Sequence, residues 1–409
     1  MSEYISKIRE AIEAKNFKLA LSLLDRAPDE LISKALYYSL RADIFSHKLQ
    51  FDHAAREAEK AILLEPDWAP PYNIFANALV ELGQYSAARS AFDIAVTLAP
   101  NVGEFTFNRG QLKLLTGDWT GARRDYESRL LSSTFNIHSD ISAKPAWLGE
   151  PIKGKRLLLY WEQGQGDTIQ FVRYVQKLEE YGNHIILEVQ NTLCRLMRAS
   201  FPKAQVISSG DELPAFDLRA AIPSLPWLLG ETPDKLYAPQ SYLAVPAEVR
   251  HPAPPSAAEI SVGLVWAGNP SHINDRQRSI SPETFLSLLN LRGVYWSSLQ
   301  FGTSEKTMRM LARAGVTDLT PGFTDFADTA AAIQALDLVI TVDTSVAHLA
   351  GALGKPVWIL LPFVPDWRWL LDRSDSPWYP SARLFRQPKR GDWASVLKEV
   401  KQALAEFRP

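Results

Sequence analysis

The segment LVITVDTSVAHLAGALGKPVWILLP, residues 338–362, decides the fold of the C-terminal part of this chain. An apolar run at Leu338–Asp343 precedes a helix that we expect over residues 345–353, and a second apolar run follows at Val357–Pro362. Short apolar runs that alternate with helices are typical of buried strands in a mostly parallel sheet. This segment therefore predicts one strand–helix–strand unit of an α/β fold.

The start of the predicted helix is a candidate anion site. The first N–H groups of a helix lack internal partners, and the helix dipole places positive charge there. Thr344 and Ser345 can also donate hydroxyl hydrogen bonds to phosphate oxygens, so we predict a diphosphate site. The alternative is that Asp343 or Thr344 is an ordinary helix cap. His348, one turn into the helix, either faces the ligand or packs.

The same alternation extends backwards along the chain to Arg156. The predicted strands are RLLLYW at 156–161, HIILEVQ at 184–190, ISVGLVWAG at 260–268, VYWSSLQ at 294–300, LVITVD at 338–343 and VWILLP at 357–362. A proline-rich stretch at 246–259 interrupts the pattern and predicts a linker. We therefore predict two Rossmann-like lobes, 156–245 and 260–409, with a ligand cleft at the carboxyl ends of their strands.

A glycine-rich loop, EQGQGDT at 162–168, follows the first predicted strand. Gly164 and Gly166 flank Gln165 and permit a sharp turn with close approach of the backbone to a ligand. The loop is not a P-loop, because no Lys-Ser/Thr follows the glycines, and it lacks the third glycine of a dinucleotide fingerprint. Asp167 ends the loop, where it would also serve as a helix N-cap.

The first third of the chain carries a 34-residue repeat. Phe51, Tyr85 and Trp119 form one column of the repeat, and an alanine stands three residues after each of them. Small residues let two helices approach closely, and the large residue fills the gap to the next unit. We predict about four tetratricopeptide-type (TPR) units over 1–136, followed by a linker over 137–155.

Three other segments are rich in polar or charged residues, which suggests that they do more than connect helices and strands. WAGNPSHINDRQRSI, 266–280, carries Asn269, Arg276 and Arg278, which favour a functional role, and an exposed basic loop is the alternative. Gly322–Ile333 places Asp328 before an expected helix. The segment 361–380 is dense in charged and aromatic residues, and its tryptophans are more simply core residues.

Composition excludes several classes of protein. The 409 residues carry 44 basic and 46 acidic side chains, so no overall charge favours nucleic acid or an anionic membrane. One cysteine, Cys194, excludes a disulfide within the chain and a cysteine-rich zinc site. No window has the length and apolarity of a membrane span, and the N-terminal stretch lacks a signal-peptide core. We expect a cytoplasmic protein.

The DTSVAH segment, the Gly-Asp pair and the 266–280 loop, together with the repeats, resemble the heptosyltransferase-like (family 9) glycosyltransferases and bacterial TPR glycosyltransferases. The resemblance implies TPR repeats followed by a GT-B fold, in which two Rossmann-like lobes enclose a nucleotide-sugar. By position it implies that Asp343, Thr344, Ser345 and His348 hold the diphosphate and sugar of the donor.

The resemblance also implies further roles. Asp167 would be the general base in an acceptor loop formed by Gly164, Gln165 and Gly166. An arginine of the 266–280 loop, preferably Arg276 over Arg278, would neutralise the charge of the departing diphosphate, and Asn269 would also bind the donor. Asp328, Asp366 and Trp367 would line the donor pocket. The chain has no Asp-x-Asp pair, so we expect neither a metal nor a cofactor.

The predicted function is transfer of a sugar from a nucleotide-sugar to a hydroxyl of a protein that the repeats recruit. Flagellin or another surface protein is the acceptor that the family suggests. One alternative is a glycosyltransferase acting on a lipopolysaccharide-type glycan. Another is a TPR adaptor whose GT-B domain has lost catalysis.

Overall fold

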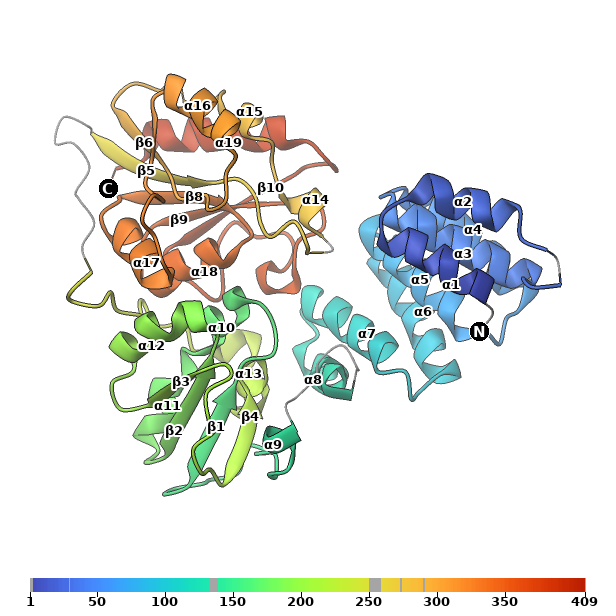
Figure 1. Ribbon diagram of the computed structural model, residues 1–409, viewed down its shortest axis with the longest axis horizontal. Coiled ribbons are helices and arrows are strands. Elements are labelled where there is room, and N and C mark those ends of the chain that lie inside the picture. The colour runs from blue at the N-terminus through green and yellow to red at the C-terminus, as the bar shows by residue number, and fades with distance from the viewer. Residues whose placement is uncertain are drawn as a thin grey trace. The chain divides into compact units, whose positions relative to one another are not determined.

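The computed structural model describes residues 3–28, 30–131, 139–249, 259–272, 274–289 and 291–408. The chain forms two compact units, of which the first comprises Met1–Asn136 with Asp366–Leu370 and the second comprises Ile137–Pro365 with Leu371–Pro409 (Figure 1). Over the described ranges, no helix is both long and apolar enough to cross a membrane.

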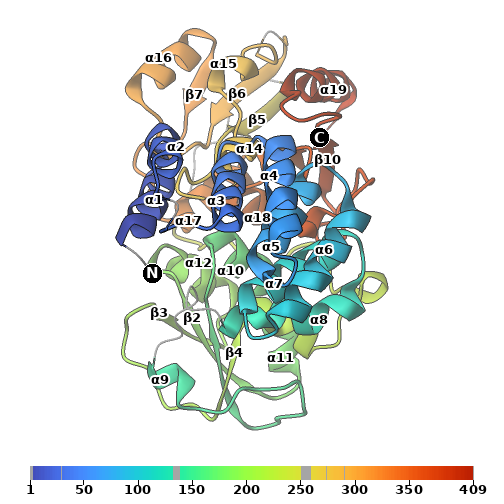
Figure 2. The same cartoon turned by 90° about the vertical axis from the view of Figure 1, so that its right-hand side faces the viewer.

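Helix pairs build the first unit, and Figure 2 shows them from α1 to α8. Ala54, Ala88 and Ala122, the small residues of the repeat, are fully buried where paired helices approach each other. The predicted TPR-type fold is confirmed. The pairs are α1 (Glu3–Glu13) with α2 (Phe17–Asp25), α3 (Lys34–His47) with α4 (Phe51–Leu64), α5 (Ala69–Glu81) with α6 (Tyr85–Leu98), and α7 (Gly103–Leu115) with α8 (Trp119–Glu127), before the 3-10 turn η1 (Ser128–Leu131).

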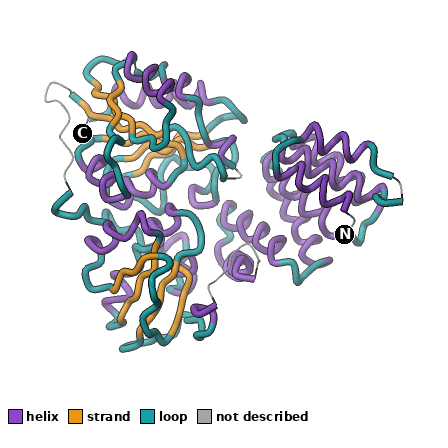
Figure 3. The backbone as a smooth tube through the Cα atoms, in the orientation of Figure 1, coloured by secondary structure: helices purple, strands orange, loops and turns teal. Residues whose placement is uncertain are grey.

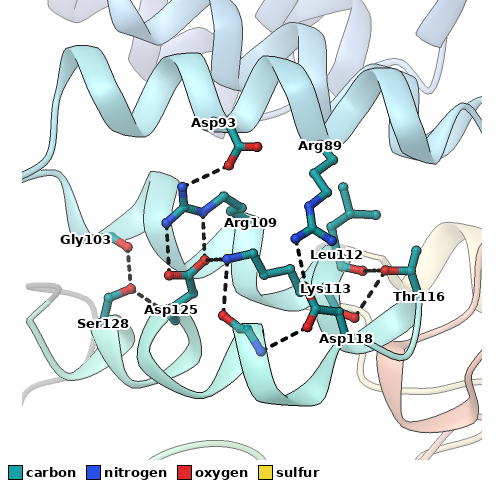
Figure 4. Close-up of polar contacts among 11 residues, drawn as sticks. Arg89, Asp93, Gly103, Arg109, Leu112, Lys113, Thr116, Asp118, Asp125 and Ser128 are labelled. Atoms are coloured by element: carbon teal, nitrogen blue, oxygen red, sulfur yellow. Dashed lines mark hydrogen bonds and ion pairs between the residues drawn. The ribbon is translucent and has the colours of Figure 1, made fainter.

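Ion pairs join the last three helices of this unit (Figure 4). Asp125 on α8 is buried and accepts hydrogen bonds from Arg109 Nε at 2.7 Å and from Lys113 Nζ at 2.7 Å. Arg109 Nη1 also donates to Asp93 Oδ1 on α6 at 3.0 Å. The two cations of α7 therefore each have a carboxylate partner inside the same unit.

The short segment Asp366–Leu370 packs with the repeats, although it lies far along the chain from them. Its 3-10 turn η5 (Trp367–Trp369) places the Trp367 ring centroid 6.1 Å from that of Trp119 and 5.6 Å from that of Tyr126. Burial of this large apolar ring against two others stabilises the attachment. The predicted lobe 260–409 is therefore corrected, because these five residues belong to the first unit.

The first sheet of the second unit is entirely parallel, with the order β3-β2-β1-β4. Its central strand, β1, is an unbroken apolar run, as expected where helices cover both faces. The elements are β1 (Arg156–Tyr160), α10 (Gln165–Phe171), α11 (Tyr174–Glu180), β2 (His184–Val189), η2 (Asn191–Leu193), α12 (Cys194–Ser200), β3 (Gln205–Ser208), β4 (Leu218–Ala221), η3 (Ile222–Ser224), α13 (Leu225–Leu228) and η4 (Pro233–Lys235), after the short α9 (Ser139–Ser142).

The second sheet of this unit is also parallel, with six strands in the order β10-β9-β8-β5-β6-β7 (Figure 3). Side chains of α15, α16 and α19, among them Phe285, Leu311 and Val400, pack against one face, and α17 and α18 lie on the other. The elements are β5 (Ile260–Val265), α14 (Asp275–Arg278), α15 (Pro282–Phe285), β6 (Val294–Ser298), α16 (Glu305–Arg313), β7 (Val316–Asp318), α17 (Phe326–Gln334), β8 (Leu338–Val342), α18 (Ser345–Ala352), β9 (Val357–Leu361), β10 (Ala382–Arg386) and α19 (Trp393–Glu406).

Both sheets have the strand order of a Rossmann-like lobe, which confirms the predicted fold class. In such sheets the strand order reverses at a switch point, where the loops after the two adjacent strands diverge and leave a ligand crevice. In the six-stranded sheet these strands are β5 and β8. They lead into the 266–280 loop and the DTSVAH segment, respectively.

Some predicted elements need correction. The glycine-rich loop expected over 162–168 is shorter, because α10 already begins at Gln165. Part of the predicted linker 137–155 pairs with β4, since Trp147 N donates to Arg219 O at 2.8 Å and Arg219 N donates to Pro145 O at 3.1 Å. The proline-rich linker predicted over 246–259 falls mostly outside the described residues.

Candidate functional site

Helix α18 starts directly after β8, and Thr344 is its N-cap residue with extended backbone angles. Within the described residues, the Thr344 side chain makes no capping hydrogen bond to the first turn. Its hydroxyl instead lies 3.2 Å from that of Thr341 on β8. The Thr344 hydroxyl therefore does not occupy the first N–H groups of α18, and such a helix start is a potential anion site. The ordinary capping role considered for Thr344 is not what its side chain does.

The Gly-Asp pair lies in the first turn of α10 and not in the loop before it. Gly164 is the N-cap residue and Asp167 is the third helical residue, so the N-cap role considered for Asp167 is wrong. The amide of Gln190 secures this loop, because its Oε1 accepts from Thr168 Oγ1 at 3.0 Å and its Nε2 donates to Gln163 O at 3.1 Å. The Gln165 side chain points to Thr192, with its Nε2 2.7 Å from the hydroxyl oxygen.

The first turns of α10 and α18 pack against each other. A Cβ atom at Gly166 would lie 2.9 Å from Cδ2 of His348 and 3.5 Å from Cα of Ser345. Only glycine allows this approach without displacing the imidazole. The structure therefore brings Gly166 and its neighbour Asp167 from one lobe to the start of α18 in the other, as the resemblance implied for an acceptor loop facing a donor site.

The His348 side chain is buried, and one of its ring nitrogens lies at hydrogen-bonding distance from a neighbour. Its Nδ1 lies 2.9 Å from the hydroxyl oxygen of Tyr379, and its Nε2 lies 4.0 Å from Oδ1 of Asp343. The ring thus packs against Tyr379 on one side and turns its second nitrogen towards the end of β8. Packing describes these surroundings, and a contact of His348 with the donor stays a prediction.

Arg278 is the arginine of the 266–280 loop that reaches the strand ends. Its Nη1 donates to the backbone carbonyl of Asp343 at 3.0 Å, and its Nε lies 3.4 Å from buried Asp275. Arg276 is exposed, and Asn269 is exposed with its Oδ1 accepting from Ser271 N in a local turn. Of the two arginines, Arg278 is therefore the one fixed beside α18, and the role expected of Arg276 stays a prediction.

Asp328 lies inside α17 rather than before it. Asp325 and Asp328 form a capping box at the helix start, and both accept hydrogen bonds from Arg195 on α12, at 2.7 and 2.6 Å from Nη2. Burial alone would raise the pKa of Asp328. Hydrogen bonds from Thr324 and Arg195 outweigh this effect, and the pKa lies below its usual value. The Asp328 carboxylate is thus committed to a helix cap and an ion pair between the lobes.

Asp366 and Trp367 belong to the first unit. The Asp366 carboxylate accepts from Arg368 N at 3.0 Å and from Arg368 Nη1 at 2.8 Å. Trp367 is 3% exposed, so its indole is a core residue of that unit. These contacts give both residues structural tasks, and their predicted place in a donor pocket stays a prediction.

Sequence reasoning missed four residues that organise this region: Gln190, Arg195, Arg173 and Tyr379. None of them stands in a recognisable motif. Arg173 lies in FVRYVQ, where an arginine inside a helical stretch is ordinary, and its contacts are with residues as distant along the chain as Tyr379. Only the three-dimensional contacts reveal their positions.

Comparison with known proteins supports the resemblance. Residues 302–360 match the family model described as glycosyltransferase family 9 (heptosyltransferase). Protein FlbA of Caulobacter vibrioides is 27% identical over 387 residues, which cover 85% of this chain and 63% of FlbA, so the chain spans less than two thirds of that relative.

Two solved structures are also similar. The E. coli heptosyltransferase WaaC with ADP-2-deoxy-2-fluoro heptose is 15% identical with a TM-score of 0.43, and the match covers 61% of this chain and 99% of WaaC. The Arabidopsis OM64 TPR domain is 25% identical with a TM-score of 0.25, over 26% of this chain and 89% of that domain.

The family match runs from the turn between β6 and α16 into β9 and includes all of the DTSVAH segment. It confirms the predicted resemblance to family 9 glycosyltransferases over these residues, and TPR-type repeats precede them along the chain. Gly166, Asp167 and Arg278 lie outside the matched residues. Their convergence on the matched segment is therefore a separate observation.

Proposed function

We propose that this protein is a glycosyltransferase that moves a sugar from a nucleotide-sugar to an acceptor hydroxyl. The main support is the close approach of Gly166 to His348, which places the helical turn that contains Asp167 beside the start of α18. One side of this junction offers helix N–H groups and the Arg278 guanidinium, which suit a diphosphate. The other side offers a carboxylate.

In the proposed reaction, the acceptor oxygen forms a bond to the anomeric carbon while the bond from that carbon to the diphosphate oxygen breaks. Asp167 accepts the proton of the acceptor hydroxyl, and the nucleoside diphosphate leaves with the bonding electron pair. The start of α18 and Arg278 stabilise the negative charge that grows on the leaving group. These groups supply positive charge without a metal, and we therefore propose a metal-independent route.

We propose a protein as the acceptor, because helical-repeat arrays commonly present a surface to peptides. A lipopolysaccharide-type glycan is the second candidate, favoured by the heptosyltransferase description of the matched family. The full-length protein should be assayed with both acceptor classes. Deleting the repeats is unsuitable as a test, since it would strip Trp119 and Tyr126 from the buried Trp367 ring.

Thermal unfolding with UDP, GDP, ADP, CMP and dTDP tests the donor site. A ligand at about 100 times its dissociation constant stabilises the native state by roughly 2.7 kcal/mol. We expect one nucleotide to raise the unfolding midpoint of the wild type, and Thr344→Ala to bind it roughly 10- to 100-fold more weakly. Thr97→Ala, at an exposed position on α6, is the control. No shift with any nucleotide would favour the adaptor alternative.

A further inference from the structure

Arg173, at the junction of α10 and α11, is fully buried. Its Nε donates to Gln170 O at 2.8 Å, and its Nη1 donates to Trp378 O at 2.7 Å and to Tyr237 O at 3.4 Å. Its Nη2 donates to the Tyr242 hydroxyl oxygen at 3.2 Å. Every hydrogen-bond acceptor of this guanidinium is a carbonyl or a phenol oxygen.

Among the described residues, no carboxylate lies within ion-pairing distance of Arg173. Aromatic rings surround the cation instead, with centroids 4.9 Å from Cζ for Tyr242, 5.3 Å for Trp378 and 4.8 Å for Tyr379. Carbonyl dipoles and ring faces stabilise a buried guanidinium but do not neutralise it. The second unit therefore holds a positive charge in a poorly hydrated interior.

Tyr379 links this charge to the candidate donor site. One ring carries the Arg173 cation against its face and places its hydroxyl 2.9 Å from Nδ1 of His348. Gly351 on α18 permits this packing, because a Cβ there would lie 2.4 Å from the Tyr379 ring. Burial raises the pKa of Tyr379 well above its usual value, so the ring stays neutral. The Tyr379 ring thus lies between the Arg173 cation and the imidazole of His348 in the first turn of α18.

We propose that Arg173 is a positioning residue whose missing counter-charge is the diphosphate of the bound donor. It would orient Tyr379 and His348, and its buried charge would favour a diphosphate at the start of α18 without touching it. This inference rests on the proposed function and adds a specific source of diphosphate affinity from the opposite lobe. A unit charge acting over roughly 10 Å at an effective dielectric constant of about 20 changes anion affinity by roughly tenfold.

The test compares Arg173→Lys with Arg173→Gln in the full-length protein. Both variants lose the guanidinium fork, but only lysine keeps the charge. For each protein, the dissociation constant is measured by calorimetry for the nucleoside diphosphate that stabilises the wild type and for the corresponding nucleoside. The ratio of these two dissociation constants is the preference for the diphosphate over the nucleoside. It reports the effect of charge, because a general disturbance of the fold would weaken the binding of both ligands. Arg309→Gln, at an exposed arginine paired with Glu305, is the control.

We expect Arg173→Gln to lose about tenfold of this preference, whereas Arg173→Lys and Arg309→Gln retain it within about threefold. Equal losses in the lysine and glutamine variants would overturn the inference and leave a purely structural role. A wild type that binds no nucleoside diphosphate would instead overturn the proposed function itself.

A second measurement does not depend on the folding of any variant. A buried charge is screened little by salt, so the preference of the wild type should fall by less than about threefold over a tenfold rise in ionic strength. Loss of the preference at high salt would assign it to exposed cations and contradict the role of Arg173.

Discussion

Arg109 in the first unit is partly buried and Arg173 in the second is fully buried, but only Arg109 has carboxylates that neutralise it. Arg109 donates to two carboxylates, Asp93 and Asp125, inside the repeats. Arg173 has carbonyls, a phenol oxygen and ring faces around it. A charge whose partners lie in the same module serves the fold of that module. A buried charge without a partner costs free energy that the fold alone does not recover, and such sites are often functional.

Among the substitutions that test this comparison, Asp125→Asn is expected to lower the free energy of unfolding most. The substitution leaves Arg109 and Lys113 without the carboxylate that they share, and removal of one partner from a buried ion pair costs about 3–5 kcal/mol. Denaturant unfolding should show this loss in the transition of the repeats, with nucleotide affinity unchanged. Asp93→Asn is the control, since its side chain is 51% exposed, and it should cost less than about 1 kcal/mol. Similar costs for both variants would contradict the assignment of Asp125 as the centre of the network.

Gly166→Ala tests the second unit, at the point where α10 packs closely against His348 of α18. The new methyl group would lie 2.9 Å from Cδ2 of His348, and overpacking of this kind costs about 1–3 kcal/mol. We expect a lower unfolding free energy and weaker nucleotide binding. In a His348→Ala background the methyl group has space, so its cost should vanish in a double-mutant cycle. An unchanged cost in that background would place the clash elsewhere.

Tyr379→Phe should have a smaller effect, because it removes one hydroxyl and keeps the ring. The lost hydrogen bond to His348 is worth about 0.5–1.5 kcal/mol of unfolding free energy. The same substitution in His348→Ala should then be nearly neutral. If the loss persists without His348, the hydroxyl contributes mainly through other partners.

The smallest effect concerns the exposed pair Arg89–Asp118 in the repeats, 2.8 Å apart (Figure 4). Burial alone would raise the pKa of Asp118. The Gly121 N–H and the Arg89 guanidinium outweigh this effect, and the pKa lies below its usual value. A lowered pKa contributes stability above the unfolded-state pKa, and this stability is lost as the pH falls through the folded-state pKa. Arg89→Ala should therefore cost up to about 1 kcal/mol at neutral pH and almost nothing in strongly acidic solution. A cost that is independent of pH would exclude the ion pair as its source.

Sequence patterns predict the elements with strong periodicity. The 34-residue columns predict the helix pairs, and the apolar runs predict β1, β2, β5, β6, β8 and β9 to within three residues at their ends. They miss β3, β4, β7 and β10, which are short or carry charged residues, as in ARLFR at 382–386. Such strands form because neighbouring strands pair with them, and local composition does not contain that information.

The site is predictable only where one motif carries it. The DTSVAH segment lies at the start of α18 as expected, because the strand and the helix are both local features. The choice between Arg276 and Arg278 depends on which side chain of a short helix faces β8, and Asp366–Leu370 is drawn to the first unit by aromatic packing. Both outcomes depend on long-range contacts, as does the role inferred for Arg173.

Hydrogen–deuterium exchange with and without the stabilising nucleoside diphosphate tests the central claim most directly. The account predicts slower exchange in peptides that cover 342–349 and 164–169, where backbone amides at the start of α18 and the adjoining turn of α10 would be covered. Peptides of the repeat helices α5 and α6 should not change. Protection in the repeats alone, or in other parts of the second unit without change at 342–349, would contradict a diphosphate site at the start of α18.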